Sequence, residues 1–183
     1  MGLDTFTIRP ASIADASALP AIERSAALLY GEFGSSKVLQ EPPVIDQITH
    51  TRWMRDGRYL VAEQGVGRRV GFLAALCCGA GKVAIMALSV RRAYQRRGLG
   101  RALLFRSLTE AGKDGIAEVW CEVDTSLPWI APLSASAGFE AVGAGDIPAS
   151  VKRIAGEHRL PVTCADRWQN WQICRPGSRA LKS

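Results

Sequence analysis

Residues 88–104 read LSVRRAYQRRGLGRALL. The pattern predicts an apolar strand that enters a glycine-containing loop, and the loop leads straight into a helix. Gly98 and Gly100 carry no side chain, so their backbone N–H groups can approach a ligand closely. The first N–H groups of a helix lack partners within it, and the helix N-terminus is partly positive. With the nearby arginines, these features predict a site for phosphate or pyrophosphate. The arginines are Arg91, Arg92, Arg96, Arg97 and Arg101.

The same stretch has a plainer interpretation, in which the glycines only permit tight packing and the arginines form a solvated face. We prefer the anion site because strand, loop, helix and arginines coincide. Other phosphate loops are excluded, since no G-x-x-x-x-G-K-S/T occurs. The spacing Gly79-x-Gly81-x-x-Ala84 imitates a dinucleotide-binding fingerprint, but a predicted strand follows it where that fingerprint requires a helix. We interpret it as a hairpin turn.

The composition fits one globular domain. The chain has 183 residues, of which 48% are hydrophobic and 22% charged, near the average of globular proteins. We therefore expect a single domain over 1–183, with 176–183 as a frayed tail. The net charge of +6 suits either a nucleic acid or a local anion, and the clustering of the arginines favours the local anion.

Cysteine, histidine and N-terminal patterns predict a cytoplasmic protein without a metal site. The five cysteines form no C-x-x-C pair, which indicates reduced thiols. His50 and His158 are far apart in the sequence, so we expect no histidine-based metal site. Residues 1–6 lack the apolar stretch of a signal peptide. The longest apolar stretch, 70–81, is too short to span a bilayer, so we expect no membrane partner.

Hydrophobic periodicity and turn residues predict an α/β protein with one mixed sheet and helices on both sides. The run 83–90, VAIMALSV, is almost wholly apolar, so we expect a central strand buried on both faces. The predicted strands are 5–9, 58–63, 70–78, 83–90, 116–123, one that starts at Gly138-Phe139, and 168–175. The predicted helices are 15–30, 44–55, 101–112, 127–137 and 149–159.

Three segments resemble a known family. The segment Gln95-Arg96-Arg97-Gly98-Leu99-Gly100 resembles the Q/R-x-x-G-x-G/A signature of the GNAT N-acetyltransferase superfamily, which binds acetyl-CoA. Leu88-Ser89-Val90 is similar to its central strand, and Ala137-Gly138-Phe139-Glu140 to its late lGFe segment. The order of elements agrees from about residue 5 to residue 143. The resemblance implies a mixed, mostly antiparallel central sheet flanked by helices on both faces, with splayed central strands.

The resemblance also implies which residues bind acetyl-CoA, the expected cosubstrate. Backbone N–H groups from Arg96 to Arg101 would hold the pyrophosphate. The main chain of 88–90 would pair with the pantetheine arm like an added strand. The thioester would then lie where this strand splays from the strand 119–123. The implied binding residues are Leu88, Ser89, Val90, Gln95, Arg96, Arg97, Gly98, Leu99, Gly100 and Arg101.

Acetyl transfer to an amine needs a base that takes a proton from the amine. The central strand 83–90 contains no carboxylate. Glu122 is our first choice because it lies at the end of the following predicted strand. The alternatives are Asp124, Glu63 and Glu32.

The acid that protonates the leaving thiolate is where the chain departs from the family. The family often has a tyrosine four residues before the Gly-Phe pair, and this chain has Ser134 there. Ser134 is our candidate acid. Otherwise the thiolate leaves unassisted, or Tyr94 or Tyr59 takes the role.

We therefore expect an N-acetyltransferase that moves an acetyl group from acetyl-CoA to a primary amine by direct attack in a ternary complex. The alternative is a non-catalytic acyl-CoA-binding or sensor protein, because the tyrosine is missing. A nucleic-acid-binding protein ranks last, since Tyr94 is the only aromatic residue within 91–101. Trp168 and Trp171 are candidates for an acceptor pocket or for core packing. The C-terminal tail is a candidate for pairing across a homodimer.

Overall fold

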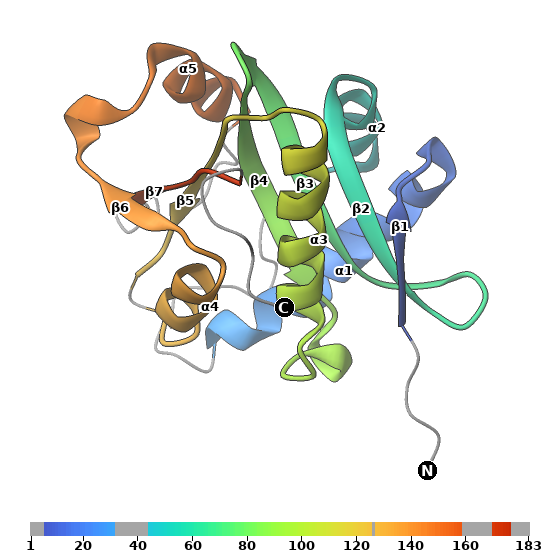
Figure 1. The fold of residues 1–183 in the computed structure, drawn as a ribbon. Helices are drawn as coiled ribbons and strands as arrows, with labels where there is room; N and C mark the ends of the chain where they lie inside the picture. Colours follow the sequence, from blue (N-terminus) through green and yellow to red (C-terminus); the bar gives the residue numbers. More distant parts are fainter. Residues whose placement is uncertain (1–5, 32–43, 126, 159–169, 177–183) are drawn as a thin grey trace. The chain divides into compact units, whose positions relative to one another are not determined.

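Seven strands form one sheet within the described residues, in the order β1-β2-β3-β4-β5-β7-β6 (Figure 1). The computed structural model describes residues 6–31, 44–125, 127–158 and 170–176. β4 and β5 pair in parallel, whereas β1 with β2, β5 with β7, and β6 with β7 pair antiparallel. The predicted mixed, mostly antiparallel sheet is therefore confirmed. The strands are β1 (Phe6–Pro10), β2 (Gly57–Gln64), β3 (Arg68–Gly79), β4 (Lys82–Val90), β5 (Glu118–Val123), β6 (Glu140–Val142) and β7 (Asn170–Cys174).

The helices occupy the intervals between the strands. None of those in the described ranges is both long enough and apolar enough to cross a membrane. The α-helices are α1 (Leu19–Gly31), α2 (Gln47–Asp56), α3 (Leu99–Lys113), α4 (Ile130–Ser136) and α5 (Ala149–Glu157). The ranges that the structure describes also contain three short 3₁₀ helices, η1 (Ile13–Ala18), η2 (Arg92–Tyr94) and η3 (Ala144–Asp146).

The first helical segment begins differently from the prediction. We expected one helix over 15–30, but the structure has the 3₁₀ helix η1 followed by α1 from Leu19. Pro20 explains the break, because proline has no N–H and clashes with the preceding turn inside a helix. It is tolerated in the first turn, which is its position in α1.

The chain divides into two compact units. The first unit contains Met1–Ala74 and Ala87–Leu103, and the second contains Ala75–Met86 and Leu104–Ser183. β3, β4 and α3 each have residues in both units. The segment that the sequence predicts to bind an anion belongs to the first unit, and the candidate residues Glu122 and Ser134 belong to the second.

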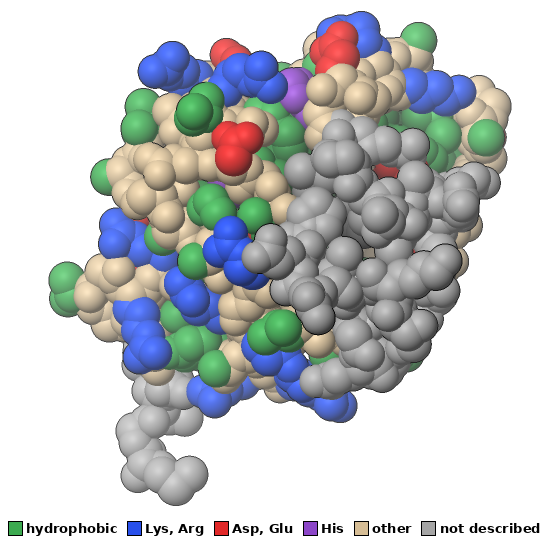
Figure 2. Space-filling view, turned by 180° about the vertical axis from the view of Figure 1, so that it is seen from behind, with side chains coloured by type: hydrophobic (Ala, Val, Ile, Leu, Met, Phe, Trp, Pro, Cys, Tyr) green, Lys and Arg blue, Asp and Glu red, His purple; other side chains and the backbone are tan. Residues whose placement is uncertain are grey.

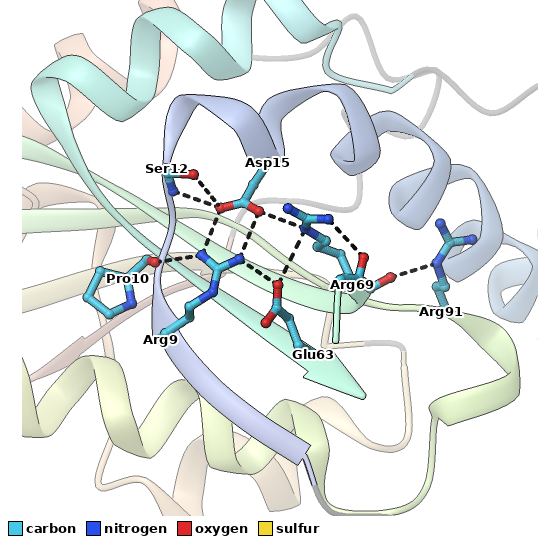
Figure 3. Close-up of polar contacts among 8 residues, drawn as sticks. Arg9, Pro10, Ser12, Asp15, Glu63, Arg69 and Arg91 are labelled. Atoms are coloured by element: carbon cyan, nitrogen blue, oxygen red, sulfur yellow. Dashed lines mark hydrogen bonds and ion pairs between the residues drawn. The ribbon is translucent and has the colours of Figure 1, made fainter. Parts of the chain in front are cut away.

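A network of charged side chains joins four elements of the first unit (Figure 3). The buried carboxylate of Asp15 in η1 accepts hydrogen bonds from Arg9 of β1 at 2.8 and 3.0 Å. It also accepts from Arg69 Nε of β3 at 2.7 Å and from the Ser12 backbone N–H at 2.7 Å. Glu63 of β2 accepts a further bond from Arg9 at 2.5 Å. The network therefore fixes β1, η1, β2 and β3 to one another.

The core of the second unit lies between its strands and α5. The strand register pairs Ala84 with Trp120 and Trp120 with Ile173. These three side chains are buried together with Ile147 and with Val151 of α5. The cluster thus covers one face of β4, β5 and β7.

β4 is less buried than its sequence predicts. We expected the apolar run 83–90 to be buried on both faces, but residues 85–89 are all half-buried. The parallel pairing with β5 runs from Lys82 to Ile85 and β4 continues to Val90. The prediction of complete burial is wrong because an apolar strand can also line an open part of a sheet, and composition alone does not distinguish the two.

Candidate functional site

The loop between β4 and α3 contains two residues of left-handed backbone conformation. Arg96 has a φ of 60° and Gly98 a φ of 80°. α3 then begins at Leu99, and the N–H of Ala102 donates to the carbonyl oxygen of Gly98 at 2.9 Å. Gly98 therefore directly precedes the first helical turn. The N–H groups of Leu99 and Gly100 belong to that turn and have no acceptor within the helix.

Open space borders the backbone of Gly98. A Cβ atom built there would have no heavy atom within 4 Å, and at a φ of 80° a side chain would also be strained. The space lies at the partly positive N-terminus of α3, a helix of 15 residues. Donors, positive potential and open space coincide, so the loop fits an anion of pyrophosphate type.

Gln95 holds the loop in shape. Its Nε2 donates to the carbonyl oxygens of Val90 at 2.9 Å and Ala26 at 3.4 Å. Nearby, the backbone N–H of Arg92 donates to Ser25 Oγ at 3.1 Å. The loop is thus tied to the end of β4 and to α1. The side chain of Gln95 is engaged with the protein, and a role at the anion site would act through the conformation of the loop.

Two guanidinium groups lie over Tyr94. Those of Arg68 and Arg97 are 5.5 and 5.6 Å from the ring centroid, within cation–π range. The ring is 7% exposed, and its hydroxyl donates to Gln64 Oε1 at 2.7 Å. Tyr94 is therefore not available for stacking on a nucleic-acid base. Sequence reasoning missed Arg68, because it comes from the start of β3 and no local pattern links it to the loop.

The remaining arginines differ in their orientation. Arg91 Nε donates to the carbonyl oxygen of Arg69 at 3.1 Å, so this side chain is turned toward β3 (Figure 3). Arg96, Arg97 and Arg101 are exposed. Figure 2 shows Lys and Arg side chains, in blue, at several places on the face drawn there. The loop thus carries exposed positive charge beside its backbone donors.

In the second unit, the pairing of β4 with β5 ends next to the predicted base. Ile85 and Cys121 are the last residues in the parallel register. Glu122 follows on β5, is half-buried, and remains paired with Trp171 of β7. The parallel pairing with β4 therefore ends one residue before Glu122.

Ser134, the predicted acid, lies in α4 and is 7% exposed. Its Oγ donates to the carbonyl oxygen of Ile130 at 3.0 Å, with Ala131 at 3.3 Å as a second acceptor. The hydroxyl must turn away from these acceptors before it can protonate a leaving group. Its catalytic role stays a prediction.

The alternative bases and acids lie in other surroundings. Glu63 is engaged in the network with Arg9 and Arg69. Asp124 is buried directly after β5. Glu32 lies outside the described residues, and so do Trp168 and 177–183. The hydroxyl of Tyr59 lies 3.2 Å from His50 Nδ1, and burial raises its pKa far above the ordinary value.

Glu23 is a buried carboxylate that sequence reasoning missed. Its Oε2 accepts the backbone N–H of Ile45 at 2.6 Å. Burial raises its pKa to about 7, and the bond from Ile45 offsets only part of that effect. It occupies an ordinary position in α1 next to Ile22, and no sequence signal separates it from an exposed helical glutamate. Within the described residues, no group of three or more His, Cys, Asp or Glu side chains could hold a metal ion.

Comparisons with known proteins give one consistent result. A family model described as the acetyltransferase (GNAT) family matches residues 27–139. The ribosomal-protein-S18-alanine N-acetyltransferase from Escherichia coli has a similar structure, with a TM-score of 0.68 and 20% identity over 98% of this chain and 99% of that one. At this identity the likeness shows the fold.

Two other solved structures are also similar. The first is yncA, a putative acetyltransferase from Salmonella typhimurium with its cofactor acetyl-CoA, with a TM-score of 0.67 and 20% identity over 98% of both chains. The second is the PaiA N-acetyltransferase from Thermoplasma acidophilum in complex with coenzyme A. It has a TM-score of 0.65 and 15% identity over 93% of this chain and 99% of that one.

Proposed function

Because this chain belongs to the acetyltransferase (GNAT) family, we propose that it transfers an acetyl group from acetyl-CoA to a primary amine. The observation that carries the proposal is the loop before α3, where open space at Gly98 adjoins exposed arginines and N–H groups that have no acceptor within the helix. Similar structures with CoA or acetyl-CoA support the ligand.

The residues of the first unit would hold the cosubstrate. The N–H groups of Gly98, Leu99 and Gly100 would bind the pyrophosphate, and Arg96, Arg97 and Arg101 would add positive charge. The main chain of Leu88, Ser89 and Val90 would pair with the pantetheine arm. The half-buried state of 85–89 supports this, because it leaves this part of β4 open to a ligand.

Glu122 would act as the general base. Acetyl-CoA would supply the acetyl group as a thioester, whose carbon–sulfur bond is replaced by a bond to the amine nitrogen. An amine is protonated near neutral pH and attacks only as the free base, so a base such as a carboxylate must take its proton. Glu122 is half-buried where β4 and β5 part, and Ser134 or water would return a proton to the thiolate.

Thiol release in the presence of amines tests the proposal. We expect Glu122→Gln to lower kcat roughly 10²–10⁴-fold at unchanged affinity for acetyl-CoA. The matched control is Glu157→Gln, which changes an exposed carboxylate of α5 and should keep full activity. If Glu122→Gln turned over as fast as the control, Glu122 would not be the base.

A non-catalytic acyl-CoA-binding or sensor protein is the second candidate function. The observation that favours it is the engaged hydroxyl of Ser134 at the position of the family's tyrosine. If Ser134 is the acid, Ser134→Ala lowers kcat at least about tenfold, and Ser134→Tyr raises it. If wild type and Ser134→Tyr both bind acetyl-CoA but neither releases thiol when an amine is added, the sensor function is favoured.

A further inference from the structure

One row of side chains crosses the sheet of the second unit at the residue that we propose as base. In the antiparallel register, Glu122 of β5 lies opposite Trp171 of β7, and Trp171 lies opposite Val142 of β6. Directly opposed residues project from the same face of a sheet. Met86 joins this face because it follows Ala84 by two positions, and Ala84 is paired with Trp120. The row is Met86, Glu122, Trp171 and Val142.

This row borders the buried core but is not itself buried. The preceding row, with Ala84, Trp120 and Ile173, is covered by the cluster around α5. Met86, Val142 and Trp171 pack against that cluster and are only half-buried, as is Ile154 of α5. The face therefore changes from closed core to accessible apolar surface at the row that contains Glu122.

Glu122 is the charged member of an otherwise apolar row. Its neighbours across β7 and β6 are an indole ring and a branched aliphatic side chain. On β4, the thioether of Met86 lies on the same face, one residue beyond the last pair of the parallel register. A cation near Glu122 would meet a carboxylate and the indole of Trp171, both of which attract positive charge. A flexible thioether such as that of Met86 adapts to varied apolar and aromatic shapes.

We propose that this row is the acceptor subsite and that it selects a primary amine carried by an apolar or aromatic body without a second positive charge. The inference rests on the proposed function. The amine nitrogen would lie at Glu122 and the body against Trp171, Met86 and Val142. A second ammonium group would lose water against these side chains, and none of Trp171, Met86 and Val142 offers it a carboxylate.

Acetylation rates for three primary amines, which differ in the group that carries the amine, test the inference. We expect kcat/KM to be at least about tenfold higher for phenethylamine than for putrescine, with butylamine in between, because apolar contacts of a few methylenes discriminate on that scale. Trp171→Ala should raise KM for phenethylamine about tenfold and leave putrescine nearly unchanged. Trp171→Phe should restore most of the preference. Asn170→Ala is the control, since Asn170 is exposed on the same strand and points to the other face.

The outcomes separate this inference from the proposed function. Equal rates for the three amines, or a preference for putrescine, would overturn the acceptor subsite while acetyl transfer stands. If no amine is acetylated, calorimetric titration with phenethylamine still decides. Saturable binding in wild type that is lost in Trp171→Ala supports the subsite although transfer fails. If phenethylamine is neither acetylated nor bound, the acceptor subsite is overturned.

Discussion

Two buried carboxylates of the first unit differ in charge because their partners differ. Asp15 is fully buried, and burial alone would raise its pKa. The bonds from Arg9, Ser12 and Arg69 outweigh that effect and hold the pKa of Asp15 well below its usual range. Glu23 has one backbone N–H as a partner, so burial dominates and raises its pKa to about 7.

The raised pKa of Glu23 predicts a stability that falls as pH rises. Between the ordinary value of 4.5 and about 7, the folded protein keeps a proton that the unfolded chain has lost. The stability linked to that proton is complete below about pH 4.5 and lost as pH rises through about 7. In Glu23→Gln the amide oxygen can still accept the N–H of Ile45, and no charge is buried. We expect the variant to be about 1–3 kcal/mol more stable than wild type near pH 8, and equal to it near pH 4.

Urea denaturation over a pH series measures this difference. Glu157→Gln serves as the control, because that carboxylate is exposed. The stability difference between wild type and Glu23→Gln could instead be the same near pH 4 and near pH 8. That result would show that Glu23 is charged in the folded protein at neutral pH.

At the residue scale, the sequence predicts little about which groups pair with Asp15 and Glu23. The partners of Asp15 are set by the tertiary fold. Arg69 is 54 residues from Asp15, and Glu63 is 54 residues from Arg9. Local patterns carry no information about such contacts, and the same holds for Trp171 opposite Glu122.

At the element scale most helices and strands could be predicted. The periodicity of 101–112 and the turn residues around β2 and β3 give α3, β2 and β3 within a few residues. The predicted helix over 44–55 begins later, at Gln47, because Asp46 caps it by accepting the N–H of Thr49 at 2.8 Å. The burial of β4 could not be predicted, since it depends on where β5 stops pairing.

A further prediction concerns Gly98, in the loop between β4 and α3. Gly98→Glu should weaken acetyl-CoA binding at least about tenfold, because the new carboxylate fills the open space and repels the pyrophosphate. The matched control is Gly65→Glu in the turn between β2 and β3, where φ is 62° and a Cβ also meets no atom within 4 Å. Both variants bear similar backbone strain. Calorimetry should show normal affinity for Gly65→Glu, and equal losses in both variants would place the site elsewhere.

At the scale of the whole molecule, we propose that the two compact units belong to one domain. β3, β4 and α3 each contribute residues to both units, so neither unit can lose these elements alone. We expect a single urea transition with the same midpoint by circular dichroism and by tryptophan fluorescence. Trp53 is the tryptophan of the first unit, so in Trp53→Phe the fluorescence reports on the second unit. If the urea midpoint of Trp53→Phe measured by fluorescence differed from the midpoint measured by circular dichroism, the units would unfold independently.

The central claim is that the loop before α3 binds acetyl-CoA. Calorimetric titration of the wild-type chain with acetyl-CoA and with desulfo-CoA tests it most directly. We predict saturable binding of both, with a Kd on the order of micromolar, because the pyrophosphate and not the sulfur is what the loop recognises. Folded protein that binds neither compound at moderate salt would contradict the claim, and with it both the transferase and the sensor.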